Sequence, residues 1–218
     1  MPRLRVKICC ISDADEMRAA VRAGADALGF VSAMATGPGV IDEDRIAAMA
    51  TGVPPPVARV LLTSALDADA IVAQALLCRP DVLQLVDYHD ADILVALRTA
   101  LPSIRLMPVV HVTGDESVDL ARRLAESADA LLLDSGNPYL PVKELGGTGR
   151  VHDWAISRTI VDTVPCPVFL AGGLRPDNVA QAVAMVRPFG LDICTGVRTG
   201  GRLDVAKLEA FMSAVRAL

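Results

Sequence analysis

Short apolar runs alternate with longer amphipathic stretches along the whole chain, which predicts strands that alternate with helices. The apolar runs are almost continuous, as is typical of parallel strands buried on both faces. Eight strands are expected, at residues 4–9, 27–31, 57–62, 82–86, 104–110, 130–134, 167–172 and 191–196. The clearest helical patterns between them lie at residues 13–25, 67–77, 90–101, 116–127, 175–186 and 204–218.

Repeated strand-then-helix units predict a (β/α)8 TIM barrel, and a doubly wound open sheet is the alternative fold. No linker, low-complexity stretch or block of charge divides the chain, so a single domain over residues 1–218 is expected. In such a barrel the chemistry takes place where the strands end and in the loops that follow. The residues at those ends are Cys9, Val31, Leu62, Val86, Asp134, Gly172 and Thr195.

Composition narrows the classes of function. The net charge of −5 and the aromatic content of 3% argue against a nucleic-acid-binding surface. The chain is 52% hydrophobic, but no apolar run approaches the roughly 20 residues that span a bilayer, so no membrane partner is expected. The first residues lack the apolar stretch and cleavage site of a signal peptide, which predicts a cytoplasmic protein.

Five cysteines are scattered without a CxxC pair, which argues against a disulfide framework and against a zinc site. Cys78 and Cys166 are expected to be small buried apolar residues. Cys9 ends the first strand, where a thiol ionised near a positive charge such as Lys7 can act as a base. Cys10 is expected to point away from Cys9, because successive strand residues face opposite sides.

Asp134 is the second candidate for proton chemistry. It ends the apolar run at residues 130–134, so its carboxylate is expected to face the barrel mouth, with a turn-capping role as the alternative. His89 and His111 fall near strand ends, but a solvated surface position is the expected outcome for both. His152 is interpreted as part of a loop surface.

Two glycine-bearing turns, at residues 170–179 and 194–201, follow the last two predicted strands. Glycine lets backbone N–H groups approach an anion, and in barrels these two loops commonly hold a phosphate. Either turn alone is weak evidence, because glycine often only ends a strand. The expected backbone donors are Gly172, Gly173, Gly196 and Val197.

A third glycine cluster follows the sixth predicted strand, within residues 145–154. A flexible surface loop is one interpretation. The other is a lid that closes over a ligand, built from Gly146, Gly147, Thr148 and Gly149.

These motifs together resemble the phosphoribosylanthranilate isomerase family. The family opens with a VKICG strand, and VKICC stands here at residues 6–10. The matching motifs fall in family order over the whole chain. They are GADALGFV (24–31), LLLDS (131–135), GGTG (146–149), DW (153–154), AGGL (171–174) and GV (196–197).

The resemblance implies a barrel of the ribulose-phosphate-binding type. It also implies the Amadori rearrangement of N-(5'-phosphoribosyl)anthranilate to 1-(2-carboxyphenylamino)-1-deoxyribulose 5-phosphate, a step of tryptophan biosynthesis. Asp134 matches the family's general acid, and Cys9 matches its general base. No metal or organic cofactor is implied. The implied partner is a small phosphorylated sugar, and a monomer is the default state, with a dimer left open.

The chain departs from the family pattern where anthranilate is expected to bind. The arginine that follows the family's second strand is missing from residues 32–40, and Val86 replaces a family histidine. Cys10 stands where the family has glycine. Arg59 and Arg198 are therefore candidate replacements for the carboxylate anchor.

Three functions stay open from the sequence. They are phosphoribosylanthranilate isomerase itself, a paralogous isomerase that takes another phosphoribosyl amine in specialised metabolism, and a phosphosugar-binding barrel without catalysis. Cys9 and Asp134 argue against the third, because phosphate binding needs neither. An aldolase is disfavoured, since no strand-end lysine is evident for a Schiff base.

Overall fold

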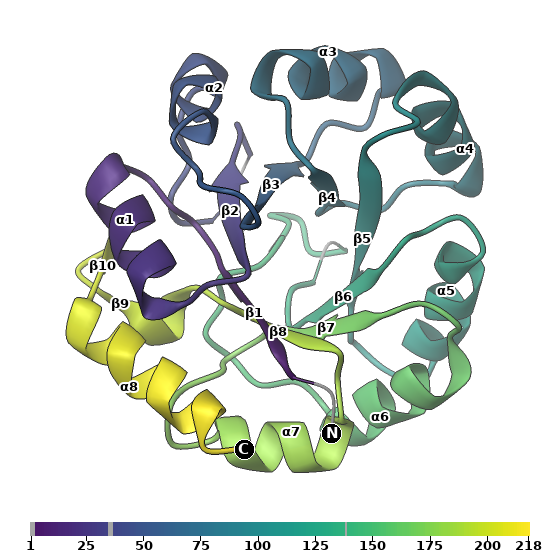
Figure 1. The fold of residues 1–218 in the computed structure, drawn as a ribbon. Helices are drawn as coiled ribbons and strands as arrows, with labels where there is room; N and C mark the ends of the chain where they lie inside the picture. Colours follow the sequence, from purple (N-terminus) through teal and green to yellow (C-terminus); the bar gives the residue numbers. More distant parts are fainter. Residues whose placement is uncertain (1–2, 35–36, 138) are drawn as a thin grey trace.

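The computed structural model describes residues 3–34, 37–137 and 139–218. Eight parallel strands close into a barrel in chain order, with β1 paired to both β2 and β8 (Figure 1). The predicted TIM barrel is confirmed, and the open-sheet alternative is wrong. The strands are β1 (Arg5–Ile8), β2 (Ala27–Val31), β3 (Ala58–Thr63), β4 (Val82–Leu85), β5 (Arg105–His111), β6 (Leu131–Asp134), β7 (Val168–Leu170) and β8 (Gly190–Ile193).

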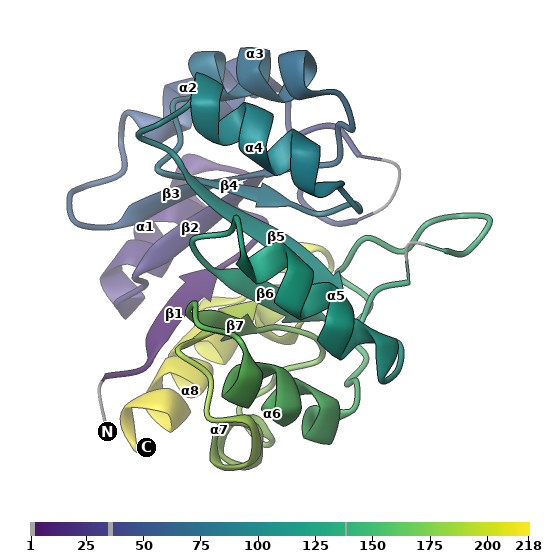
Figure 2. The ribbon, with the colours of Figure 1, turned by 90° about the vertical axis from the view of Figure 1, so that its right-hand side faces the viewer.

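Helices surround the barrel, and each follows its strand in the chain (Figures 1 and 2). In the described part of the chain they are α1 (Ala14–Ala23), α2 (Glu43–Ala50), α3 (Ala68–Cys78), α4 (Ala91–Ala100), α5 (Glu116–Ala125), α6 (Trp154–Thr163), α7 (Val179–Val186) and α8 (Val205–Arg216). None of them is long and apolar enough to cross a membrane. Helices α2 and α6 are the two that the apolar spacing did not single out.

Aspartate begins many of these helices, which explains where they start. An aspartate oxygen accepts backbone N–H groups that the first turn leaves without a partner. Asp13 accepts from the N–H groups of Asp15 and Glu16, each at 2.9 Å. The aspartates that cap in this way are Asp13, Asp42, Asp67, Asp153 and Asp204.

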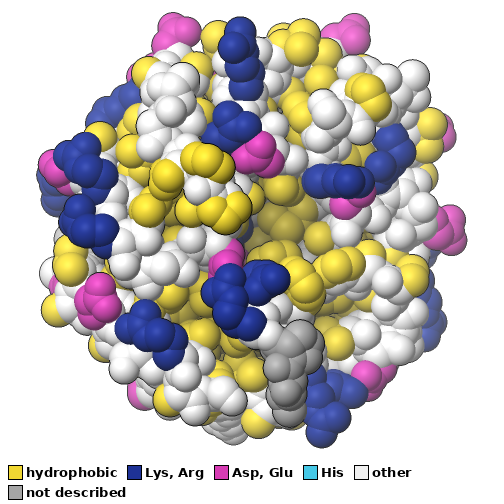
Figure 3. Space-filling model, in the orientation of Figure 1, with side chains coloured by type: hydrophobic (Ala, Val, Ile, Leu, Met, Phe, Trp, Pro, Cys, Tyr) yellow, Lys and Arg dark blue, Asp and Glu magenta, His cyan; other side chains and the backbone are white. Residues whose placement is uncertain are grey.

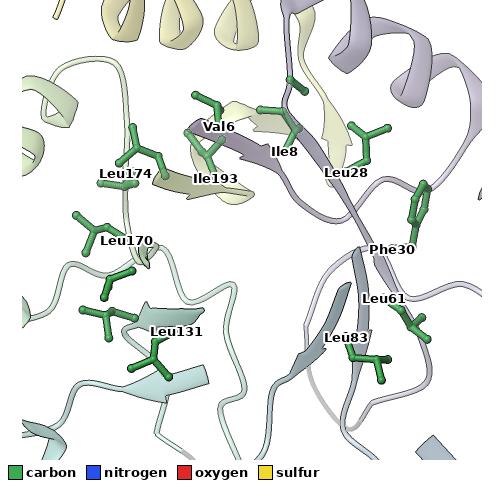
Figure 4. Close-up of a cluster of buried hydrophobic side chains, with 14 of the residues drawn as sticks. Val6, Ile8, Leu28, Phe30, Leu61, Leu83, Leu131, Leu170, Leu174 and Ile193 are labelled. Carbon is green, nitrogen blue, oxygen red and sulfur yellow. The ribbon is translucent and has the colours of Figure 1, made fainter. Parts of the chain in front are cut away.

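Strand alternation divides the buried side chains into two clusters. Side chains such as Ile8, Leu28 and Leu83 point outward and pack under the helices (Figure 4). The other cluster fills the barrel interior and includes Cys9 and Leu132. Because strand residues two apart share a face, the residues that face the interior are also those that reach the barrel mouth.

The two ends of the barrel differ in character. Figure 3 views the end where the strands begin, and it shows apolar side chains at the centre with basic side chains around them. At the other end, the loops that follow the strands project beyond the barrel (Figure 2). Past β8 the chain forms a short turn, η1 (Thr195–Val197), and a hairpin of β9 (Arg198–Thr199) and β10 (Arg202–Leu203).

Two leucines test the outer core. Leu94 on α4 is fully buried, whereas Leu76 on α3 is 64% exposed. We expect Leu94→Ala to lower the free energy of unfolding by about 2–5 kcal/mol, because it leaves a cavity. The same truncation at Leu76 is expected to cost no more than about 0.5 kcal/mol. Urea unfolding measures both values, and equal losses would contradict this assignment of the core.

Candidate active site

Cys9, the candidate base, lies directly after β1 in the mouth of the barrel and is 3% exposed. Its backbone N–H donates to the carbonyl of Ile193 at 2.8 Å, which extends the pairing of β1 with β8. Lys7, two residues earlier, shares the inward side of the strand. Its Nζ donates to Cys9 Sγ at 3.2 Å and to Asp192 Oδ1 at 2.8 Å.

These contacts set the protonation of the thiol. Burial alone favours a neutral Lys7 amine, but the charges of Asp192 and Cys9 outweigh it, so the pKa of Lys7 is raised. The pKa of Cys9 is lowered, because the S–H of Cys10 hydrogen-bonds to its sulfur and the Lys7 ammonium adds to this against burial. Cys9 therefore ionises more readily than an ordinary thiol.

Sequence reasoning missed two residues around this thiol. At Gly29 a Cβ would lie 2.9 Å from Cys9 Sγ and 3.0 Å from Lys7 Nζ, so only glycine leaves room for both side chains. Gln84 on β4 and Cys9 line the same pocket at the barrel mouth, and Gln84 Oε1 has no hydrogen-bond partner among the described residues. The signal for each was an unusual residue, a glycine or an amide, in the middle of an apolar strand.

Asp134, the candidate acid, ends β6 and lines the pocket as predicted. Burial raises the pKa of its carboxyl, opposed by the Ser135 N–H, which donates to Oδ1 at 2.7 Å. The backbone of Gly146 approaches closely, since a Cβ there would lie 2.8 Å from Asp134 Oδ2. Asp134 is thus easier to protonate than a free aspartate, which suits a proton donor.

Cys9 and Asp134 line the same pocket, whose cavity is small, about 60 Å³. One part of its wall is apolar and comes from β2, β3, β4 and their loops together with the loop after β6. The apolar residues there are Val31, Met34, Leu62, Val86 and Leu145.

Cys10 does not point away, so that expectation is wrong. Strand β1 ends at Ile8, and the backbone of Cys10 is left-handed, with φ of 64°. The alternation of sides holds only in extended backbone, so the Cys10 side chain also lines the pocket. Within the described residues no three His, Cys, Asp or Glu side chains are grouped to hold a metal ion.

The loops after β7 and β8 bring three of the four predicted phosphate donors to the pocket, Gly172, Gly173 and Gly196. The backbone is tightly packed at Gly196, where a Cβ would lie 2.1 Å from the carbonyl oxygen of Leu174. Val197 is different. It is fully buried outside the pocket, and its N–H donates to the Cys194 carbonyl at 3.2 Å inside the η1 turn. Its N–H is therefore already occupied.

The glycine-rich loop after β6 borders the pocket with all four predicted lid residues, Gly146, Gly147, Thr148 and Gly149. The hydroxyls of Thr148 and Ser135 lie 2.7 Å apart. This contact ties the loop to the end of β6, beside the candidate acid. Whether the loop opens and closes stays a prediction.

Neither candidate carboxylate anchor reaches the pocket. Arg59 lies near the start of β3 and is bound to Asp81 through Nε at 2.9 Å and Nη2 at 2.6 Å. Arg198 is buried beneath the chain that follows Cys9, where it pairs with Glu16 at 3.0 Å and donates to the Cys10 carbonyl. Both guanidinium groups are therefore held by structural partners. No Lys or Arg of the described residues lines the pocket.

The histidines at the strand ends are buried, so the expected surface position is wrong. His89 is 4% exposed and contacts the carbonyls of Asp87 and Ala65 at 2.9 and 2.8 Å. His111 is 6% exposed, and its Nε2 lies 2.9 Å from the Val86 carbonyl. Burial lowers the pKa of His152 to about 4. None of these three rings lines the pocket.

Of the two cysteines expected to be buried, Cys78 and Cys166, only one is. Cys78 is buried, as expected, and burial raises the pKa of its thiol to about 11. Cys166 is only half-buried, so that expectation is wrong.

The family model described as N-(5'phosphoribosyl)anthranilate (PRA) isomerase matches residues 6–214. The chain belongs to this family. Its sequence is 34% identical to the N-(5'-phosphoribosyl)anthranilate isomerase of Methanocella arvoryzae over 213 residues, which cover 97% of this chain and 98% of that protein. The family resemblance found in the motifs is thereby confirmed.

Solved structures of the family share the fold. The phosphoribosyl anthranilate isomerase of Thermotoga maritima superposes with a TM-score of 0.83 at 28% identity, over 99% of this chain and 100% of that chain. A second family structure contains reduced 1-(o-carboxyphenylamino)-1-deoxyribulose 5-phosphate. It superposes with a TM-score of 0.80 at 26% identity, over 99% of this chain and 100% of that chain.

The buried Lys7–Asp192 pair gives a stability test. We expect Lys7→Met to lower the free energy of unfolding by about 3–5 kcal/mol, because it leaves the Asp192 carboxylate unpaired in the interior. The double variant Lys7→Met/Asp192→Leu should recover most of this loss. The control Arg158→Ala, which breaks an exposed pair with Asp162, should cost less than about 1 kcal/mol. Urea unfolding distinguishes these outcomes, and equal losses for Lys7→Met and Arg158→Ala would refute the assignment.

Proposed function

We propose that this chain converts N-(5'-phosphoribosyl)anthranilate to 1-(2-carboxyphenylamino)-1-deoxyribulose 5-phosphate, a step of tryptophan biosynthesis. One observation carries the proposal. A thiol supported by a buried ammonium and a carboxyl with a raised pKa line the same pocket. The reaction needs this pair of groups, because it adds a proton at one atom of the sugar and removes a proton at another.

Asp134 acts first in the proposed mechanism. Its carboxyl gives a proton to the ring oxygen of the ribose, the bond from that oxygen to C1 breaks, and the amine nitrogen shares the positive charge as an iminium. The raised pKa of Asp134 supports this role, because a more basic carboxylate keeps its proton more often.

Cys9 acts second. Its thiolate removes the proton from C2, and the electrons of the C–H bond neutralise the iminium to give an enolamine. The enolamine then tautomerises to the ketone product. Lys7 does not react, but its ammonium stabilises the thiolate before the substrate proton is taken.

The remaining residues of the pocket hold the substrate. Backbone N–H groups at Gly172, Gly173 and Gly196 are proposed to bind the phosphate, and the unpaired Gln84 oxygen to accept from a sugar hydroxyl. The lid residues would exclude water from the charged intermediates. The chemistry requires no metal or organic cofactor.

A Cys9 thiolate and a protonated Asp134 carboxyl are rarely present at the same pH, and the two pKa shifts make this combination more frequent. The productive enzyme needs a Cys9 thiolate and a protonated Asp134, although a free aspartate is the stronger acid. The lowered pKa of Cys9 and the raised pKa of Asp134 bring the two values closer together. Each unit of approach raises the productive fraction about tenfold at a pH between them.

Activity and its pH profile test the mechanism. We expect Cys9→Ala and Asp134→Asn each to lower kcat by about 10²–10⁴-fold, followed through the loss of substrate fluorescence. Cys166→Ala and Asp162→Asn, remote from the pocket, are the matched controls. Retained turnover in either active-site variant would overturn the assignment.

The pH profile of kcat/KM should be bell-shaped, with its basic limb at the pKa of Cys9. Without the ammonium, Lys7→Met raises the pKa of Cys9. The plateau should therefore fall about tenfold per unit of that rise, while the basic limb moves to higher pH. An unchanged basic limb would contradict the role of Lys7.

One observation favours a second candidate, a paralogous isomerase for another phosphoribosyl amine. No described Lys or Arg lines the pocket, and its wall at Val31, Met34, Leu62 and Val86 is apolar. Losing a charge-assisted contact to a carboxylate costs roughly tenfold to a hundredfold in affinity. With no such contact, removing the carboxylate from the substrate should cost little.

The substrate analogue made with aniline in place of anthranilate measures this directly. We expect kcat/KM for the analogue to fall less than about tenfold below that for the anthranilate compound. A larger loss would mean that a cation reaches the carboxylate in the complex, and it would eliminate the paralogue. If the enzyme turns over the aniline analogue but not the anthranilate compound, the paralogue is favoured over the first proposal.

The location, oligomeric state and partners of the enzyme are also proposals. We infer that the enzyme acts as a cytoplasmic monomer on a small phosphorylated sugar, without nucleic acid or membrane partners. Light scattering during gel filtration measures the oligomeric state, and a mass twice that of the chain would replace the monomer with a dimer.

A further inference from the structure

Three thiols meet where β1 and β8 end. Cys9 is the proposed base, and Cys10 and Cys194 lie beside it at the mouth of the pocket. The Sγ atoms of Cys10 and Cys194 are only 2.7 Å apart. The family relationship does not explain this pair, because Cys10 stands where the family motif has glycine.

The backbone holds the two sulfurs in a geometry suited to a covalent bond. Ile8 and Ile193 are register partners on adjacent strands, and the Cys9 N–H continues the pairing at 2.8 Å. These contacts bring the ends of β1 and β8, and with them Cys10 and Cys194, close together. From 2.7 Å, the sulfurs need to approach by only about 0.7 Å to reach the length of an S–S bond.

The position of Cys10 is unusual for a residue with a side chain. Its backbone has φ of 64°, a conformation that favours glycine. The loop after β2 makes room for its side chain, because a Cβ at Gly39 would lie 2.7 Å from Cys10 Cβ. A thiol is therefore held against Cys194 in a place where glycine would be the easier residue.

An oxidant can reach the pair through the pocket. Both residues line it, and Cys194 is only partly buried. Redox-sensitive cysteines are typically accessible and placed next to a second cysteine that completes the disulfide.

We propose that Cys10 and Cys194 are a modification site, at which a peroxide forms a reversible disulfide that reduces the activity of Cys9. The Cys194 sulfur attacks one peroxide oxygen, the O–O bond breaks, and a sulfenic acid and one water form. The Cys10 sulfur then attacks the sulfenic sulfur, the S–O bond breaks, and the Cys10 proton leaves with the hydroxide as a second water. Two thiols lose two electrons to one peroxide, and a dithiol reductant reverses the change.

The disulfide acts on the base because Cys10 and Cys194 line the same pocket as Cys9, and Cys10 is its neighbour in the chain. In the reduced protein the Cys10 thiol lowers the pKa of Cys9, and a disulfide has no S–H to donate. Oxidation therefore leaves Lys7 as the remaining described donor to Cys9 and makes the thiolate harder to form. This effect on turnover rests on the proposed function, whereas formation of the disulfide does not.

Mass spectrometry tests the bond itself. The full chain is treated with one equivalent of hydrogen peroxide, and the remaining thiols are then alkylated. We expect a loss of two hydrogen atoms and a cross-link that persists in Cys9→Ser and in the control Cys166→Ala. The cross-link should disappear in Cys10→Gly, which suits the left-handed backbone, and in Cys194→Ala. Absence of the cross-link in the wild type, or its presence in Cys10→Gly, would overturn the proposal.

Activity tests the consequence. We expect oxidation to lower kcat/KM of the wild type at least tenfold near neutral pH, with recovery after dithiothreitol. Because the oxidised and reduced forms of each variant are compared with each other, Cys10→Gly and Cys194→Ala should lose the dithiol-reversible change whatever their own activity. A cross-linked wild type with unchanged activity would refute the switch alone. A reduced wild type without turnover would refute the proposed function and leave the cross-link result valid.

Discussion

A lysine ammonium buried at the centre of the barrel is the constraint on which the site depends. Lys7 has no access to water, so its charge must be neutralised within the protein. Asp192 on β8 does this at 2.8 Å, which ties the first strand to the last across the closure of the barrel. The remaining donors of the ammonium are available to Cys9, so the same charge that requires a partner also stabilises a thiolate.

The packing around Lys7, Cys9 and Asp134 leaves no room for further side chains at two neighbouring positions. Gly29 must lack a side chain for Lys7 and Cys9 to fit, and Gly146 must lack one beside Asp134. The polar groups occupy the inward face of strands whose outward face packs under the helices. A buried charge, a thiol and an acid therefore coexist with a large apolar core, because strand alternation separates the two environments.

The arginines show how a charge is diverted from an expected role. Arg198 comes directly after the η1 turn, which holds the candidate phosphate donor Gly196, and proximity in sequence made it a candidate anchor. In the fold, Glu16 and the carbonyls of Cys9 and Cys10 take up its guanidinium, so it braces the chain after the base instead. A guanidinium has five donors, and a buried position that satisfies most of them is favoured over the pocket.

The sequence by itself determined the barrel and the order of its strands, because apolar periodicity and motif order are local properties. It also brought the candidate acid and base, Asp134 and Cys9, to the pocket. The helical patterns that apolar spacing singled out did not include α2 and α6. Tertiary structure alone decided which charges meet. Arg59 pairs with Asp81 and Cys10 contacts Cys194, and in each case the two residues come from different loops or strands. The burial of His89 and His111 likewise depends on residues far away in the sequence. Cys10 also depended on a left-handed backbone, which strand alternation does not describe, and that one φ angle brings its side chain beside the base.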